Sequence, residues 1–293
     1  MAGGQMDMAD GRIPLKKGYQ LVADKEKKYV IESILGRGGS CIVYEASYKD
    51  RQGMPHKVRI KECYPAALVN LSRNTDGSMN VPEQAKLRFD EAKKSFTEAY
   101  NRNVALRNME GLTNSTVDVT NIYNVNNTLY SAMEYNQGEN YKTYMENHPE
   151  EDLHTFLRRM VTLTKIIGEY HVNGLLHLDI KPENMLLIPE TEEHMILFDF
   201  DSIIAKEDLQ NGKVLGIASS EGFAAPEQIN RKWEKIGQHT DIYAIGAMVF
   251  WKLFGRRPDA AANGLFAKFD MKSMVNWNDA YQPMLIRKLD EFL

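Results

Sequence analysis

One short stretch decides how the rest of this chain is interpreted, His177-Leu178-Asp179-Ile180-Lys181-Pro182-Glu183-Asn184. It follows a segment with the apolar periodicity of a helix and precedes the short apolar run 185–188, so we expect a loop between the two. On such a loop Asp179 can orient a hydroxyl group, while Asn184, five residues further on, can hold a metal ion. The stretch therefore predicts the transfer of a phosphoryl group.

Two other segments supply groups that this chemistry needs. Asp199 falls directly after the predicted short strand 195–198, where its carboxylate could chelate a Mg²⁺ ion that bridges nucleotide phosphates. Far upstream, three glycines lie between two predicted strands and, because they lack a Cβ atom, allow backbone amides to approach phosphate oxygens. They are Gly36, Gly38 and Gly39. Taken alone, this glycine-rich turn is a weak signal.

Lys61, at the end of the β-rich run 58–61, is placed to reach the α and β phosphates of a nucleotide. It needs an acidic partner to fix its position. Glu98 and Glu91 are both candidates, because they are seven residues apart and lie on nearly the same face of a predicted helix. We prefer Glu98, which is nearer to the next predicted strand, and leave Glu91 as the alternative.

The patterning along the chain predicts an α+β fold in two parts. The first part has β-rich runs separated by glycine and polar residues, which favours an antiparallel sheet, and one long helix. Its expected elements are strands at 29–31, 41–44, 58–60, 117–125 and 128–135 and a helix at 83–108, with Asn126-Asn127 as the hairpin turn between the last two strands. Beyond residue 135 helical periodicity dominates. The main expected helices there are residues 153–170 and 241–254.

In their order, these motifs resemble the catalytic domain of the eukaryotic-type (Hanks-type) serine/threonine protein kinases. Ala225-Pro226-Glu227 resembles the close of that family's activation segment, and 241–246 resembles the helix that anchors its catalytic loop. The resemblance covers residues 28–293 and implies a bilobal fold whose last helix is missing from this chain. The implied segments are a flexible N-terminal segment at 1–27, a small N-lobe at 28–135 and a mainly helical C-lobe at 136–293.

The resemblance implies an enzyme that uses ATP and Mg²⁺, with Mn²⁺ as an alternative, to phosphorylate Ser or Thr hydroxyls of proteins, itself included. Asp179 would orient the acceptor hydroxyl, and Lys181 would stabilise charge on the transferred group. Lys181 is the residue that serine/threonine members carry, which disfavours tyrosine specificity. Lys61 with Glu98 would position ATP. The run 61–65 is similar to bacterial members of the family.

The same register assigns residues to four roles. Those implied for catalysis are Asp179, Lys181, Asn184, Lys61 and Glu98. Those implied for the nucleotide are Gly36, Gly38, Gly39, Val43, Lys61, Met133, Glu134 and Tyr135. Those implied for the metal are Asn184 and Asp199. Those implied for the activation segment and the protein substrate are Ser219, Ser220, Phe223 and Glu227.

Four residues depart from the family pattern. Cys41 takes the place of the third glycine, and Asp201 that of the glycine in the metal-binding motif. Arg59 stands where the family has a small alanine against the adenine ring. It either weakens ATP binding or lays its aliphatic stem along the purine, with its guanidinium group in solvent. Leu178 replaces an arginine that pairs with a phosphorylated activation loop, so we expect activity without that phosphorylation.

Two other functions stay open. The motif at 199–201, Asp-Phe-Asp, is also similar to small-molecule kinases of the aminoglycoside or choline type, against which Lys181 and the Ala-Pro-Glu motif argue. A nucleotide-binding pseudokinase that acts as a scaffold is suggested by Cys41, Arg59 and Asp201 together. Retention of Lys61, Asp179, Asn184 and Asp199 argues against it.

Composition limits the partners and the location. The 293 residues include 36 basic and 40 acidic side chains, a net charge of −4, which gives no electrostatic reason to expect nucleic acid. Two cysteines cannot form a disulfide framework, so a reducing, cytoplasmic compartment is expected. No apolar run reaches the roughly 20 residues of a membrane span. The chain could be the cytosolic part of a longer, membrane-anchored protein, and its oligomeric state is left open.

Overall fold

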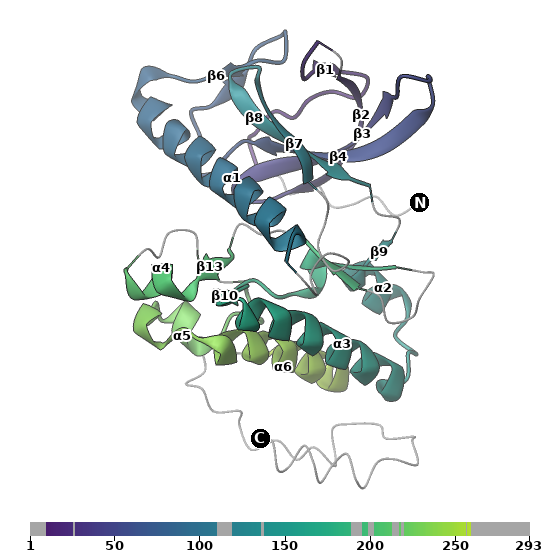
Figure 1. Ribbon diagram of the computed structural model, residues 1–293, viewed down its shortest axis with the longest axis vertical. Coiled ribbons are helices and arrows are strands. Elements are labelled where there is room, and N and C mark those ends of the chain that lie inside the picture. The colour runs from purple at the N-terminus through teal and green to yellow at the C-terminus, as the bar shows by residue number, and fades with distance from the viewer. Residues whose placement is uncertain are drawn as a thin grey trace, which may run out of the picture. The chain divides into compact units, whose positions relative to one another are not determined.

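The computed structural model describes residues 10–25, 27–109, 119–135, 138–188, 195–198, 202–212, 217, 220–255 and 257–258. Contacts divide the chain into two compact units, Met1–Gln137 and Gly138–Leu293, and each is described here by itself. The architecture is α+β, with an N-terminal antiparallel sheet and a long helix, as the sequence predicted. Figure 1 shows the elements with their labels.

The first unit is built on a six-stranded sheet with the order β1-β2-β3-β4-β8-β7, in which all neighbours are antiparallel. The strands are β1 (Gln20–Val22), β2 (Lys28–Arg37), β3 (Cys41–Lys49), β4 (Pro55–Cys63), β7 (Val119–Val125) and β8 (Thr128–Glu134). The predicted turn between the last two is confirmed. Asn126 and Asn127 both have positive φ, which is the conformation that a two-residue type I′ hairpin requires.

Alternation along the strands separates the two faces of this sheet. Ile42, Tyr44 and Ile60 are completely buried and belong to a core cluster on one face. Helix α1 (Lys86–Arg107), preceded by the 3-10 turn η1 (Glu83–Ala85), contacts β4, β7 and β8 and adds Phe89 and Phe96 to this core. A small hairpin of β5 (Ser72–Arg73) and β6 (Met79–Asn80) precedes the helix. The opposite face carries Lys61.

The expectation of a flexible segment over residues 1–27 has to be corrected for residues 10–25. Strand β1 pairs with β2, and Leu15 and Leu21 are buried in the sheet's core cluster. Strand β1 covers only three residues, too few to give a clear pattern, and residues 10–19 before it include four charged residues and two glycines. Their attachment comes from tertiary contacts with residues more than 25 positions away.

The second unit is mainly helical, with three small strand pairings. Its helices are α2 (Tyr141–Asn147), α3 (Leu153–Val172), α4 (Lys206–Gln210), α5 (Pro226–Ile229) and α6 (Gln238–Phe254), with 3-10 turns η2 (Pro182–Asn184) and η3 (Trp233–Lys235). Its strands are β9 (Glu139–Asn140), β10 (Leu175–Leu176), β11 (Met185–Leu187), β12 (Met195–Leu197) and β13 (Ile204–Ala205). They pair as β12-β11-β9 and β10-β13.

Helix α3 is the amphipathic helix that the sequence predicted at 153–170. The Asp152 carboxylate caps it by accepting from the Thr155 N–H at 2.9 Å, and one stripe of its surface, which includes Phe156, Leu163 and Ile167, is buried. Helix α6 runs beside it (Figure 1) and ends at Gly255, whose positive φ allows the left-handed cap. These two helices support the loop that follows β10.

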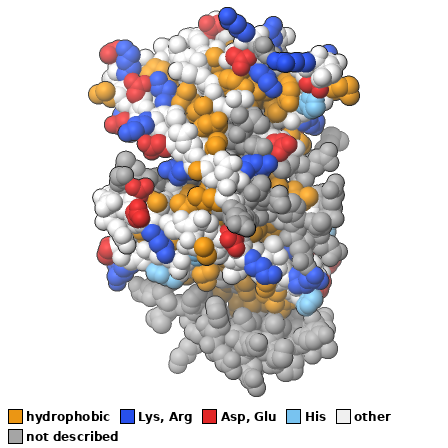
Figure 2. All heavy atoms as spheres, viewed as in Figure 1, with side chains coloured by type: hydrophobic (Ala, Val, Ile, Leu, Met, Phe, Trp, Pro, Cys, Tyr) orange, Lys and Arg blue, Asp and Glu red, His pale blue; other side chains and the backbone are white. Residues whose placement is uncertain are grey.

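The surface of the described residues mixes charges of both signs. On the face shown in Figure 2, basic and acidic side chains are interspersed over both units. Within the described residues, no helix is long and apolar enough to cross a membrane.

Candidate active site

The catalytic loop predicted from residues 177–184 lies between β10 and β11 and ends in the 3-10 turn η2. Asp179 and Asn184 are both nearly buried, and the structure brings them together. The Asn184 side-chain amide donates to Asp179 Oδ2 at 2.9 Å and to the Asp179 backbone oxygen at 2.9 Å. These hydrogen bonds join two residues that are five positions apart in the sequence. They use the Asn184 amide nitrogen, and the amide oxygen is a ligand of the type that Mg²⁺ prefers.

Two more predicted residues meet at the same carboxylate. Lys181 Nζ lies 2.8 Å from Asp179 Oδ2 and 2.9 Å from Ser220 Oγ. Ser220 in turn donates its hydroxyl hydrogen to Asp179 Oδ1 at 2.6 Å. Each oxygen of the Asp179 carboxylate is therefore hydrogen-bonded, and one of them already accepts from a hydroxyl group, which is the interaction that acceptor orientation requires.

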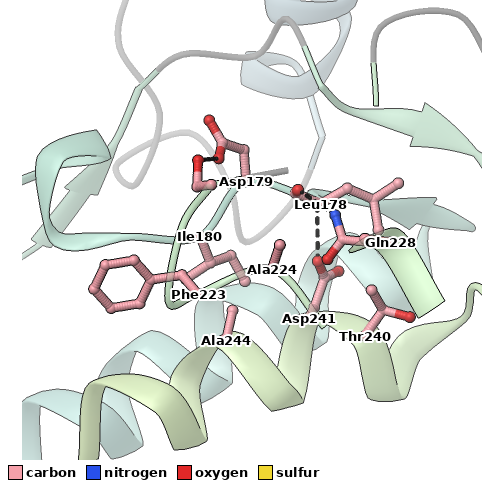
Figure 3. Close-up of a pocket in the computed structure, with 10 residues that line it drawn as sticks. Leu178, Asp179, Ile180, Phe223, Ala224, Gln228, Thr240, Asp241 and Ala244 are labelled. Atoms are coloured by element: carbon pink, nitrogen blue, oxygen red, sulfur yellow. Dashed lines mark hydrogen bonds between the residues drawn. The ribbon is translucent and has the colours of Figure 1, made fainter. Parts of the chain in front are cut away.

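The backbone of the loop is held by Asp241, at the start of α6. Its carboxylate accepts from the N–H groups of His177 at 3.0 Å and Leu178 at 2.8 Å, and from the His171 ring at 2.8 Å. Asp241 is 1% exposed, so these donors, rather than water, stabilise its negative charge. Figure 3 shows the carboxylate below the loop with the bond to Leu178. This agrees with the anchoring role that the sequence assigned to the helix at 241–246.

Leu178 adopts a left-handed backbone conformation, with φ of 60°, which is unfavourable for a residue other than glycine. Its N–H is bound by Asp241, and its carbonyl accepts from the Gln228 side-chain amide at 2.8 Å. Gln228 also accepts from the Ala225 N–H at 3.0 Å, at the start of α5. Its bond to Leu178 therefore links α5 to the catalytic loop. Asp241 and Gln228 together stabilise the strained conformation.

Gln228 was missed in the sequence, although one signal was present. A glutamine at the third position of a helix commonly reaches back to the N–H of the capping residue, which here is Ala225. That signal explains one of its two hydrogen bonds. The other, to Leu178, spans 50 residues and is visible only in the tertiary structure.

The residues predicted for the activation segment are placed as follows. Phe223 is buried and packs edge-on against Trp251 of α6, with ring centroids 6.0 Å apart. Glu227 accepts from Thr240 Oγ1 at 2.6 Å, at the start of α6. Ser219, Asp199 and Asp201 lie outside the described residues. Within the described part of the chain, no group of three or more His, Cys, Asp or Glu side chains is suited to hold a metal.

In the first unit, the predicted nucleotide residues share one region of the sheet. Lys61 pairs with Val43 on β3 and with Ser131 on β8, and directly paired residues present their side chains on the same face. Gly36 pairs with Val43, and the Gly38 N–H donates to the Cys41 carbonyl at 2.9 Å, which forms the turn. Met133 and Glu134 end β8, and Tyr135 follows.

Arg59 lies on the same face as Lys61, two residues along β4. It pairs with Glu45 and Met133, and its guanidinium carbon lies 5.4 Å from the centroid of the Tyr135 ring. Burial lowers the pKa of Arg59, an effect that Tyr135 and Glu45 oppose. The guanidinium group of this partly buried residue therefore contacts the Tyr135 ring, and the effect of Arg59 on ATP binding stays a prediction.

The acid nearest to Lys61 in sequence is Glu62, on the other face of the strand, and its role was not foreseen. It is completely buried, forms an ion pair with Arg73 at 2.7 Å, and accepts from the hydroxyls of Tyr44 at 2.7 Å and Tyr130 at 2.6 Å. Burial, together with Glu62, raises the pKa of both tyrosines, which therefore stay protonated and donate.

The two candidate partners of Lys61 lie on the exposed side of α1. Glu98 and Glu91 are both exposed, whereas the buried residues of that helix are Phe89, Phe96, Ala99, Asn103 and Leu106. The pairing of Lys61 with Glu98, with Glu91 as the alternative, stays a prediction.

Comparison with known proteins gives a consistent result. The model of the protein kinase domain family matches residues 72–284. Calcium/calmodulin-dependent protein kinase type 1 of Caenorhabditis elegans is 27% identical over 149 residues, which cover 50% of this chain and 40% of that protein. The smooth-muscle myosin light chain kinase of Gallus gallus is 33% identical over 113 residues, covering 37% of this chain and 6% of that protein. The chain spans less than half the length of these relatives.

Proposed function

Because this chain belongs to the protein kinase domain family, we propose that it transfers the γ-phosphoryl group of ATP to Ser or Thr hydroxyls of proteins, its own included. The observation that carries the proposal is the cluster of Asp179, Lys181 and Asn184 with Ser220. A carboxylate held by three donors, one of them a hydroxyl, is suited to orient an attacking hydroxyl group.

Each group in the cluster has a distinct role in this proposal. Asp179 Oδ1, which accepts from Ser220 at 2.6 Å, orients the substrate hydroxyl and takes its proton as the hydroxyl oxygen bonds to the γ-phosphorus and the bond from that phosphorus to the ADP leaving group breaks. Lys181, whose charge is close to both residues, stabilises the negative charge of the transferred group. Asn184 is fixed by Asp179, so that its amide oxygen stays available to a metal ion.

The donor and the metal come from outside the chain. ATP supplies the phosphoryl group, and Mg²⁺, or Mn²⁺ in its place, neutralises charge on the phosphates. We assign Asn184 and Asp199 to the metal, and Lys61, supported by Glu98, to the α and β phosphates. The support for Lys61 is its place on the same sheet face as Val43, beside the glycine-rich turn.

We also propose that activity does not require phosphorylation of the activation segment. Leu178 is 4% exposed and offers no charge to a phosphate group. The backbone of the loop is instead held by Asp241 and by Gln228, which belongs to α5 directly after the Ala-Pro-Glu motif. These hydrogen bonds are between residues of the chain itself, so no added charge is needed to form them.

Finer assignments rest on sequence features. We propose a bacterial Hanks-type kinase, supported by the run 61–65, and a cytoplasmic location, supported by the small number of cysteines, two, which are not joined by a disulfide.

Phosphoryl transfer tests the proposal directly. Radiolabelled ATP with Mg²⁺ is mixed with the chain alone and with general protein substrates, and phosphoamino acids are then identified. Asp179→Asn should lower transfer by at least about 100-fold, the lower end for a positioned acid or base. Glu146→Gln, at an exposed site on α2, is the matched control. Equal transfer by wild type and Asp179→Asn would overturn the proposal.

The transfer assay, extended to small-molecule acceptors, and a melting-temperature measurement separate the two alternative functions. Transfer only to aminoglycosides or choline identifies a small-molecule kinase. A rise in melting temperature with Mg²⁺-ATP but no transfer to any acceptor identifies a pseudokinase, because a ligand that binds only the folded state stabilises it.

A further inference from the structure

Residues 10–16, here called the N-terminal strap, cross the edge of the sheet where β3 begins and β4 ends. The Ile13 N–H donates to the Tyr64 hydroxyl at 3.4 Å, and the Leu15 N–H donates to the Tyr44 hydroxyl at 3.1 Å. Leu15 is buried in the core of the sheet. Arg73 donates to the Ile13 carbonyl at 2.7 Å. The strap is therefore fastened to the sheet along its length.

Arg12 makes the central contact of the strap. Its guanidinium group, in a residue only 8% exposed, donates to the backbone carbonyls of Cys41 and Tyr64. A buried guanidinium group needs a counter-charge. Asp10 supplies it through two bonds, Nη2 to Oδ2 at 2.6 Å and Nε to Oδ1 at 2.8 Å. This bidentate geometry is the strong form of the interaction.

The atoms that Arg12 and Asp10 contact belong to both arms of the glycine-rich turn. Cys41 begins the outgoing arm at β3, and Arg37 ends the incoming arm at β2. Arg37 donates to the Arg12 carbonyl at 3.0 Å and lies 3.6 Å from the Asp10 carboxylate. The strap thus binds the turn from both sides.

A second set of bonds ties the tip of the turn to the segment after β4. The Tyr64 N–H donates to the Ser40 carbonyl at 3.1 Å, and the Ala66 N–H donates to the Gly39 carbonyl at 2.8 Å. Arg12 bridges these two segments, because it bonds Tyr64 on one side and Cys41 on the other. Glycine backbones lose the most conformational entropy when they become ordered. Contacts that already order this turn therefore lower the entropy cost of ligand binding.

The strap is also connected to β4, the strand that carries Lys61. Arg73 connects the Ile13 carbonyl to the buried carboxylate of Glu62, which follows Lys61 on β4. Burial disfavours charge on Arg73, but the adjacent carboxylate of Glu62 outweighs it and raises the pKa. The strap is therefore connected to the strand that carries Lys61 as well as to the glycine-rich turn.

We propose that Asp10 and Arg12 are positioning residues for the glycine-rich turn, holding its two arms in the arrangement that receives the nucleotide phosphates. This inference rests on the proposed nucleotide site. Neither residue contacts the nucleotide, and their effect passes through the backbone at residues 37–41. Loss of the Asp10–Arg12 pair weakens ATP binding. It leaves the rate of the chemical step and the binding of the protein substrate unaffected.

The first experiment measures kinetics on the full chain. Arg12→Ala should raise KM for ATP by roughly 3- to 30-fold, the range for residues that act on a ligand indirectly, with kcat and KM for the protein substrate changed less than about twofold. Arg12→Lys, which keeps the charge but loses the bidentate geometry, should fall between. Arg88→Ala, at an exposed arginine on α1, should match wild type.

The second experiment needs no activity, so it separates this inference from the proposed function. Amide hydrogen exchange is compared at residues 36–41 and, as a reference, in α3 without nucleotide. Arg12→Ala should speed exchange at 36–41 and leave α3 unchanged. If Arg12→Ala does not fold, Asp10→Asn carries the same expectation. Unchanged exchange at residues 36–41 in a folded variant would contradict the positioning role of Asp10 and Arg12. Absence of ATP binding by the wild type would instead contradict the proposed function.

Discussion

Asp241 holds Leu178 in a conformation that leucine disfavours. Its Oδ1 accepts from the Leu178 N–H at 2.8 Å, and its Oδ2 accepts from the preceding N–H of His177 at 3.0 Å. The left-handed φ of Leu178 turns the chain just before Asp179. The position of the proposed catalytic carboxylate thus depends on a side chain more than 60 residues away.

Replacing Asp241 should damage both stability and turnover. Asp241→Ala leaves two buried N–H groups without an acceptor, each costing about 1–3 kcal/mol, so the free energy of unfolding should fall by roughly 2–6 kcal/mol. Turnover measured on the remaining folded protein should fall as well. Urea unfolding and kcat are the measurements, with Asp90→Asn on the exposed face of α1 as control. A variant with wild-type kcat would contradict the anchoring role.

Gln228 should tolerate no acidic replacement. In Gln228→Glu the ionised carboxylate cannot donate to the Leu178 carbonyl, and a buried charge is introduced at a side chain only 3% exposed. We expect a loss of about 2–4 kcal/mol in the free energy of unfolding and a lower kcat. Gln84→Glu, at an exposed site, is the control. Equal unfolding midpoints for the two variants would show that the bond to Leu178 is unimportant.

A negative charge at Ser220 should inhibit the protein. The Ser220 hydroxyl lies 2.6 Å from Asp179 Oδ1, so a phosphate or carboxylate there would face Asp179 and compete for Lys181. Ser220→Asp should therefore lower phosphoryl transfer by at least about tenfold, and by more than Ser220→Ala does. Ser95→Asp, at an exposed position on α1, is the control. Higher activity in Ser220→Asp would indicate phosphorylation-dependent activation instead.

Arg59 should help to bind the nucleotide rather than block it. Because its guanidinium group lies over Tyr135, its aliphatic stem is left along the sheet face that carries Lys61. Arg59→Ala should raise KM for ATP by about 3- to 10-fold, as expected for loss of one to two buried methylene groups. Arg59→Met, which keeps the stem, should stay near wild type. A lower KM in Arg59→Ala would mean that the side chain occludes the site.

The Asp10–Arg12 pair should be sensitive to acid. Hydrogen bonds from Arg12 hold the pKa of Asp10 well below its usual value of 3.8, so the pair contributes stability above that pH and loses it as the pH falls. The difference in unfolding free energy between wild type and Asp10→Asn should be constant above about pH 5 and shrink below about pH 4. Urea unfolding from pH 2.5 to pH 7 measures it. A constant difference over that range would show that Asp10 is not stabilised as a carboxylate.

Much of the fold could be predicted from local sequence patterns. The glycine-rich turn, the Asn126-Asn127 hairpin and the period of α3 are set by residues close together in sequence, because turn conformation and amphipathic faces depend on neighbours a few positions apart. The catalytic loop is equally local. Asp179, Lys181 and Asn184 lie within six residues, and their side chains are hydrogen-bonded in the structure.

The tertiary structure decided what holds these local pieces in place. Gln228 bonds Leu178 across 50 residues, Arg12 bonds Tyr64 across 52, and the buried Glu62 meets Tyr130 across 68. A polar residue at such a position looks like any surface residue in the sequence, because its burial depends on which distant segment covers it. The sequence by itself therefore determined which residues of the loop lie together and the order of the main elements. Only the packing of distant segments decided which polar side chains support them.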